Sequence, residues 1–233
     1  SITCSVLILI LLVFGRTKLH RLWTLLNIAV FFWGVGTTMI SVVTDMPLIR
    51  LGWLIAHVGG YFIAILYYHT ICIFTGITNK RFLALGYIFT ILATLVTLFT
   101  NDVIANLGLM FNSLIYPQAT IGYIIIYLSW GFIGAMASYK LFKFMNSERG
   151  IKLLQAKYLL VAFVSGFIGG GSVLLPAFGI ALYPMGNFAT AFYAIIGTYA
   201  ILKLRVMDIK VATTRAGIFS IVYIILLGIP LWM

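Results

Sequence analysis

Side chains that could do chemistry are scarce in this chain, whose 233 residues include three His, two Cys and four Asp or Glu. His57 and His69 fall in one apolar segment, about 18 Å apart along a helix axis. Axial ligation of a single haem needs ligands on opposite faces, usually from different helices. Cys4 and Cys72 show no metal-binding spacing and are expected to be buried thiols. We therefore expect no metal and no cofactor within these residues.

Carboxylates and nucleophiles give equally little sign of catalysis. The glycines before Ser172 do not form a serine-nucleophile motif, and Gly166 and Gly170 have the spacing that lets two helix backbones approach closely. Proton pumps and ion-coupled transporters normally carry carboxylates inside the membrane. Here every acid lies at the end of an apolar segment: Asp45, Asp102, Glu148 and Asp208. We expect no catalytic residue, and coupled transport is disfavoured.

Polar and aromatic side chains recur at helical spacing in three apolar segments. A lipid-facing surface disfavours such groups, so these stripes should face the interior of a helical bundle, where they would form an outward-opening pocket. The pocket would bind a small, mostly apolar or lipid-derived signal. The open alternative is that these groups only make interhelical hydrogen bonds or anchor helices at the interface. The candidates are His57 and Tyr61 of the third segment, Tyr116, Tyr123 and Tyr127 of the fifth, and Asn187 and Thr190 of the seventh.

The composition is that of an integral membrane protein. Mean hydropathy is +1.15, and charged residues make up 8% of the chain, against about 25% in a soluble domain. We predict an all-α polytopic transmembrane bundle of seven helices plus a truncated eighth. The sensor domain would span residues 1–215, and residues 216–233 would begin an additional helix. The seven predicted segments are Ile2–Phe14, Leu22–Val43, Leu51–Phe74, Phe82–Phe99, Ala119–Phe144, Ala156–Leu175 and Phe188–Leu202.

The distribution of charge predicts an orientation. The net charge is +11, and Lys and Arg gather in every second gap between apolar segments, as with Arg16, Lys18 and Arg21 in the first gap. Short cytoplasmic loops retain such residues, so the N-terminus should lie outside and residues 203–215 inside. Basic residues spread among loops do not form a nucleic-acid surface, so the expected partners are anionic membrane lipids and not nucleic acid.

Four stretches of sequence resemble the N-terminal seven-helix sensor region of membrane histidine kinases, in the same order along the chain. They are TKLHRLWTLLNIAVFFWGVGTTM at Thr17–Met39, WLIAHVGGYFIAILYYHTICIFTG at Trp53–Gly76, QAKYLLVAFVSGFIGGGSVLLPAFGI at Gln155–Ile180 and YAILKLRVMDI at Tyr199–Ile209. The resemblance implies a bacterial plasma-membrane receptor module for an unknown small-molecule signal, in a kinase that forms a homodimer. ATP and Mg would bind only to a downstream kinase domain, and a response regulator would receive the phosphoryl group.

The end of the seventh segment would couple the signal to that output. Lys203 and Arg205 can reach the inner headgroups and fix the depth of the helix. Asp208 would either pair with a neighbouring base or simply mark the helix end. A cytoplasmic output would also require a further helix after the truncated eighth. The alternative function is a transporter for a small molecule or lipid, or a membrane scaffold, without kinase output.

Overall fold

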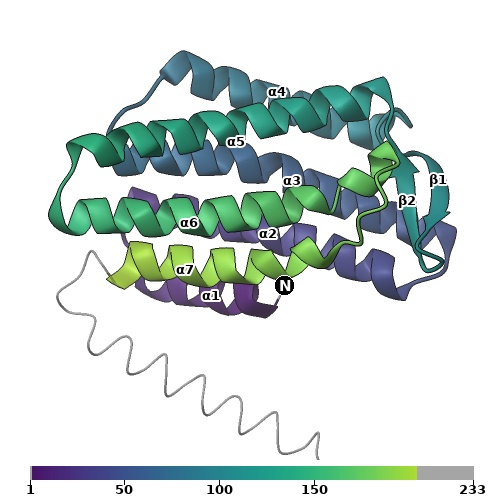
Figure 1. Ribbon diagram of the computed structural model, residues 1–233, viewed down its shortest axis with the longest axis horizontal. Coiled ribbons are helices and arrows are strands. Elements are labelled where there is room, and N and C mark those ends of the chain that lie inside the picture. The colour runs from purple at the N-terminus through teal and green to yellow at the C-terminus, as the bar shows by residue number, and fades with distance from the viewer. Residues whose placement is uncertain (1, 204–233) are drawn as a thin grey trace, which may run out of the picture.

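The structure, a computed structural model, describes residues 2–203 and forms a bundle of seven α-helices (Figure 1). Each predicted helical segment is confirmed, with ends that differ by up to six residues, because long apolar runs separated by polar gaps indicate helices in a membrane protein. Residues 204–233 lie outside the described part, so the eighth segment and the domain boundary at 215 stay predictions. The helices are α1 Ile2–Phe14, α2 Lys18–Val42, α3 Met46–Thr75, α4 Lys80–Phe99, α5 Ile121–Ser147, α6 Gly150–Ser172 and α7 Ala189–Lys203.

Five of these helices, α2 to α6, are long and apolar enough to cross a membrane. A hydrocarbon core of about 30 Å needs about 20 helical residues, and these helices have 20 to 30. Helices α1 and α7 have 13 and 15 described residues, so their membrane crossing stays a prediction. The chain is therefore a helical membrane protein, and seven spans remain the expectation from sequence.

Polar residues in the gaps fix where the helices begin. The side chains of Thr17, Asp45, Asn79 and Thr120 each accept a hydrogen bond from a backbone N–H in the first turn of α2, α3, α4 and α5. These N–H groups have no partner within the helix itself. The capping residues explain why charged and polar residues stand between the apolar segments even where they carry no topological signal.

Helices α2 and α3 pack with their backbones in contact. A Cβ atom at Gly59 would lie 2.6 Å from the carbonyl oxygen of Ala29 and 2.7 Å from the amide nitrogen of Trp33. A Cβ atom at Gly36 would likewise collide with the backbone of Gly52 and Ala56. Small residues allow this approach, which lipid-embedded helices use in place of hydrophobic burial.

A β-hairpin interrupts the helical order between α4 and α5, which the all-α prediction missed. Strands β1 Ala105–Met110 and β2 Leu114–Gln118 pair antiparallel. The turn holds Phe111 and Asn112 at φ of 55° and 56°, as a type I′ turn requires at both central positions. The hairpin lies at one end of the bundle (Figure 1).

The hairpin and two short 3₁₀ helices cover this end of the bundle. The indole Nε1 of Trp53 on α3 donates to the carbonyl oxygen of Ile115 over 2.9 Å, and the amide of Ala119 donates to the carbonyl of Ala177 over 2.8 Å. These bonds join the hairpin to the helices and to the segment after α6. The 3₁₀ helices are η1 Leu175–Phe178 and η2 Met185–Phe188.

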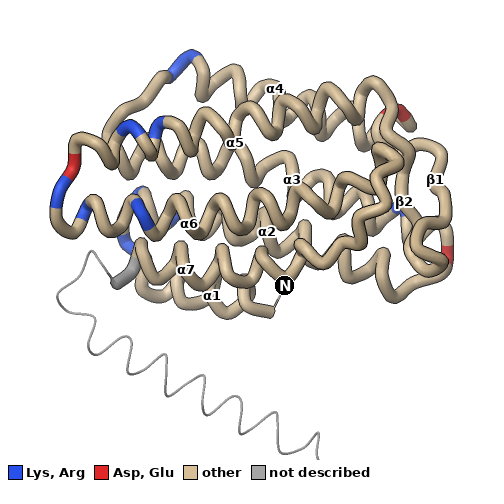
Figure 2. Tube along the Cα trace, viewed as in Figure 1, with Lys and Arg blue, Asp and Glu red and all other residues tan. Residues whose placement is uncertain are grey.

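Basic residues gather at the opposite end of the bundle, at the α1–α2, α3–α4 and α5–α6 turns (Figure 2). Asp45 and Asp102 lie at the hairpin end. Arg50 is the one described basic residue at this end, and its guanidinium donates a hydrogen bond to the Asn101 side chain. The alternation read from the sequence is therefore also a separation in space, with one strongly basic end.

The α2–α3 contact yields a stability prediction. Replacing Gly59 with Ala should lower the free energy of unfolding by about 1–3 kcal/mol, because the methyl group forces the two backbones apart. Unfolding of the purified protein by SDS titration, followed by circular dichroism, measures the change. The control is Gly131→Ala on α5, where a Cβ atom meets nothing within 4 Å. Equal stability of the two variants would contradict the packing argument.

Candidate functional site

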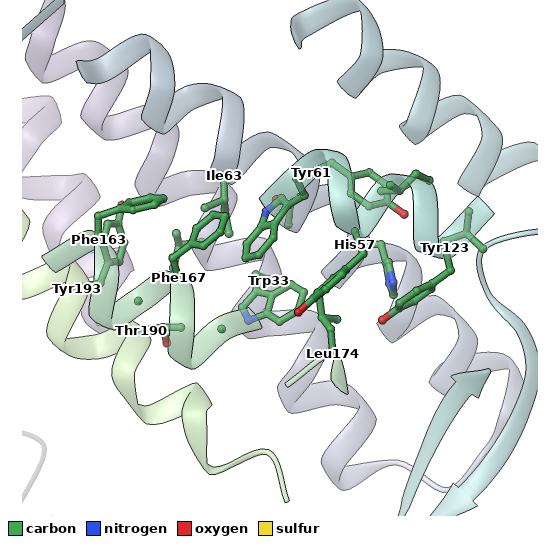
Figure 3. Close-up of a pocket in the computed structure, with 18 residues that line it drawn as sticks. Trp33, His57, Tyr61, Ile63, Tyr123, Phe163, Phe167, Leu174, Thr190 and Tyr193 are labelled. Atoms are coloured by element: carbon green, nitrogen blue, oxygen red, sulfur yellow. The ribbon is translucent and has the colours of Figure 1, made fainter. Parts of the chain in front are cut away.

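An internal cavity of about 60 Å³ lies between α2, α3, α5, α6 and α7, on the hairpin side of the bundle (Figure 3). Five of the seven candidate pocket residues line it. They come from three helices, and no local pattern in the sequence predicts how those helices align with one another. The five are His57, Tyr61, Tyr123, Tyr127 and Thr190.

The walls of the cavity are aromatic. Trp130 continues the interior-facing stripe of Tyr123 and Tyr127 at helical spacing, whereas Trp33 and Phe167 were not predicted. Trp130 stacks on Phe167 with ring centroids 3.6 Å apart and an angle of 6° between the planes. Its indole Nε1 donates to the carbonyl oxygen of Gly60 over 3.0 Å, which fixes the ring between α5 and α3. Trp33 of α2 lies against Gly60 and forms another wall. Trp33 and Phe167 are apolar residues in apolar segments, so no local signal distinguishes them from lipid-facing neighbours.

His57 presents one defined nitrogen to the cavity. Its Nδ1 lies 2.8 Å from the carbonyl oxygen of Trp53, which can only accept a hydrogen bond, so Nδ1 carries the proton. In the neutral ring Nε2 is then an acceptor, and no described protein group pairs with it. The side chain is 4% exposed. His57 is therefore a buried acceptor without a protein partner.

Tyr123 brings a second unpartnered group to the same end of the cavity. Its ring packs edge-on against the His57 ring, with centroids 5.5 Å apart, and the side chain is 2% exposed. The Tyr123 hydroxyl has no described hydrogen-bond partner, and neither has that of Tyr193, which lies at the other end of the cavity in Figure 3. Buried polar groups are normally paired, so these unpaired atoms make the cavity the candidate binding site.

Other polar candidates are engaged between helices, as the alternative interpretation expected. The Tyr61 hydroxyl lies 2.9 Å from Thr97 Oγ1 on α4, so Tyr61 contributes its ring to the cavity wall and its oxygen to helix packing. His69 Nδ1 lies 2.9 Å from the Tyr87 hydroxyl. The interhelical-bonding interpretation therefore holds for Tyr61, and the binding role of the other residues on the stripes stays a prediction.

The remaining two candidates, Tyr116 and Asn187, line a neighbouring groove of about 600 Å³ on the hairpin side of the cavity. The Asn187 amide accepts from Trp33 Nε1 and donates to Thr37 Oγ1, each over 3.1 Å. Burial, with a smaller contribution from nearby Tyr183, raises the pKa of Tyr116 to about 12, so its hydroxyl stays neutral. Thr190 lines both the groove and the cavity, so the two spaces adjoin.

The structure corrects three helical assignments. Tyr116 lies in strand β2 and Asn187 in η2, so neither belongs to the helical stripe predicted for it. A glycine contact was assigned to Gly166 and Gly170, but the second close approach is made by Gly169, where a Cβ atom would lie 2.5 Å from Ala189 Cβ. Gly170 faces the cavity instead, and a Cβ atom there would meet only Thr190, at 3.8 Å.

One of the three predicted coupling residues lies within the described part of the chain. Lys203 is the last residue of α7, at the basic end of the bundle, and Arg205 and Asp208 lie outside the described residues. In residues 2–203 no three His, Cys, Asp or Glu side chains come together in a metal-binding group. No family model, curated protein or solved structure matches this chain.

The two buried tyrosines give a matched pair of substitutions. Tyr61→Phe removes the bond to Thr97 and should lower the free energy of unfolding by about 1 kcal/mol. Tyr123→Phe removes a hydroxyl without a partner and should leave stability unchanged or raise it by up to about 1 kcal/mol. SDS titration of the two ligand-free variants measures which of them has the lower free energy of unfolding. A clear loss of stability in Tyr123→Phe would mean that its hydroxyl is bonded in the protein.

Proposed function

We propose that this chain is the transmembrane sensor domain of a bacterial two-component histidine kinase. It would pass an external or membrane-borne signal to a cytoplasmic kinase that binds ATP and Mg, works as a homodimer and phosphorylates a response regulator. The kinase output rests on the sequence resemblance. The sensor role rests on the cavity, and above all on the contribution that α7 makes to its wall.

Helix α7 connects the cavity to the end where an output would begin. Thr190 and Tyr193, in its first turns, line the cavity, and the same helix ends at Lys203 among the basic residues. Two further contacts tie its second half to the bundle. Trp23 Nε1 donates to Thr198 Oγ1 over 2.9 Å, and Gln155 Nε2 donates to the carbonyl oxygen of Ala200 over 3.2 Å. A ligand that moves the start of α7 would therefore act on its far end.

The proposed mechanism is a shift between two helix packings. A ligand changes such an equilibrium only if it binds one packing more tightly than the other. The cavity could offer this difference, because its walls come from five helices and three of its polar atoms, on His57, Tyr123 and Tyr193, lack described partners. Movement of α7 would pass through residues 203–215, including Arg205 and Asp208, to the kinase.

Transport is the weaker alternative. Within residues 2–203 the acids lie at the ends of the bundle and none lines the cavity. Between the cavity and the basic end stands a packed core with fully buried Leu19, Ile71, Leu141 and Leu159. A pocket that adjoins a groove on one side and a filled core on the other suits a receptor better than a conduit.

The proposed orientation places the hairpin outside the cell, in the plasma membrane, and the basic end inside. We expect a cysteine at Asn112, in the hairpin turn, to react with a membrane-impermeant maleimide in intact cells. A cysteine at Ser147, at the end of α5, should react only after permeabilisation. The background would have Cys4 and Cys72 replaced with Ser. The reverse pattern would overturn the orientation, and with it the route of the signal.

The kinase output is tested with the whole protein in inverted membrane vesicles supplied with γ-labelled ATP. We expect phosphate on a histidine, recognised as label that is stable to base and labile to acid. Filling the cavity with Gly170→Leu should change this label about fivefold, the effect of a shift of about 1 kcal/mol between two packings. Gly131→Leu is the control. Absence of acid-labile phosphate in folded protein would refute the proposed output.

A further inference from the structure

We infer that the cavity selects a small, neutral molecule with a ring-shaped apolar body and one hydroxyl group, held by His57 and Tyr123. The inference names the ligand class of the sensor site and rests on the proposed function. It is carried by two unpartnered polar atoms at one end of an aromatic cavity.

The two polar atoms are complementary to a hydroxyl group. His57 Nε2 can only accept, because Nδ1 holds the proton in its bond to the Trp53 carbonyl. The Tyr123 hydroxyl can donate. A ligand hydroxyl would donate to Nε2 and accept from Tyr123, so both protein groups and the ligand oxygen would be satisfied. A ligand without a donor would leave Nε2 unpaired.

Charged ligands are excluded by the lining of the cavity. Among the described residues that form it, none is Lys, Arg, Asp or Glu. A carboxylate or ammonium group would therefore enter an apolar space without a counter-charge, which is strongly unfavourable. A purely apolar ligand avoids this cost, but it leaves both polar atoms unsatisfied. Sites built around a hydroxyl reject analogues that lack it for this reason.

The size and shape of the apolar part of the ligand are inferred from the aromatic walls and the volume of the cavity. Trp33 and Phe167 present aromatic surfaces to the cavity (Figure 3), and Trp130 lines it as well. A ring packs favourably against such surfaces. About 10–15 Å³ of such free volume holds one water, so 60 Å³ corresponds to about four to six waters and suits a single ring. Gly170 keeps this space open, since its nearest neighbour beyond α6 is Thr190.

The experiment compares 4-fluorophenol with fluorobenzene, which differ only in the hydroxyl group. Fluorine NMR measures binding to the whole protein in lipid nanodiscs, at equal concentrations of the two probes in the lipid. Gly170→Leu, with the cavity filled, gives the baseline for partition into lipid, and Gly131→Leu is the matched control. We expect 4-fluorophenol to bind about tenfold more tightly than fluorobenzene.

Tyr123→Phe tests the recognition itself, because it retains the ring and removes only an unpartnered hydroxyl. We expect this variant to bind the two probes within about threefold of each other, with fluorobenzene binding unchanged. Equal binding of the probes by the unaltered protein, or binding of neither above the Gly170→Leu baseline, would overturn the ligand class.

The test of the ligand class and the test of the sensor role can fail independently of each other. If the probes fail but Gly170→Leu still changes histidine phosphorylation, the sensor stands and its ligand belongs to another class. If the protein selects 4-fluorophenol but cavity filling has no effect on phosphorylation, the ligand class stands and the sensor role is wrong.

Discussion

The close backbone contact between α2 and α3 determines where the cavity side chains can lie. Within a bilayer, burial of apolar side chains contributes little to helix association, because lipid is also apolar. Close packing and interhelical hydrogen bonds must therefore drive the association. Gly36 and Gly59 remove the side chains that would keep these two helices apart. Trp33 consequently lies against Gly60, and His57 faces the interior beside it. With Gly60 and Trp33 in place, Trp130 can reach the Gly60 carbonyl and close the wall from α5.

The pairing of polar groups then separates structural roles from a binding role. Tyr61 and His69 each have a partner on α4, and Trp23 has one on α7, so these side chains hold helices together. His57 Nε2 and the Tyr123 hydroxyl are as deeply buried but have none among the described residues. Proteins tolerate such costs where a ligand supplies the missing partner. Residues that share one helical stripe in the sequence thus differ in function because of what faces them.

The candidate site was partly predictable because polar residues in apolar segments are costly unless they face the interior. That reasoning found His57, Tyr61, Tyr123, Tyr127 and Thr190, all of which line the cavity. It did not find Trp33, Phe167 or Gly170 as cavity residues, since an aromatic residue or glycine in a membrane helix can equally well face lipid or pack against a neighbouring helix. The hairpin was missed as well. Its signal was Asn112, a residue that favours the left-handed conformation, between two short apolar runs.

The sequence by itself determined which segments are helical, with ends that differ by up to six residues, and which of those ends are basic. Hydropathy, capping residues and loop charge act over a few neighbouring residues, so a local pattern reveals them. Only the tertiary structure decided that Gly169 makes the helix contact while Gly170 opens the cavity, and that Tyr61 has a partner while Tyr123 does not. These outcomes depend on how helices rotate and shift against one another. That relation joins residues far apart in the chain, such as Tyr61 with Thr97 or Trp33 with Asn187, and no local pattern encodes it.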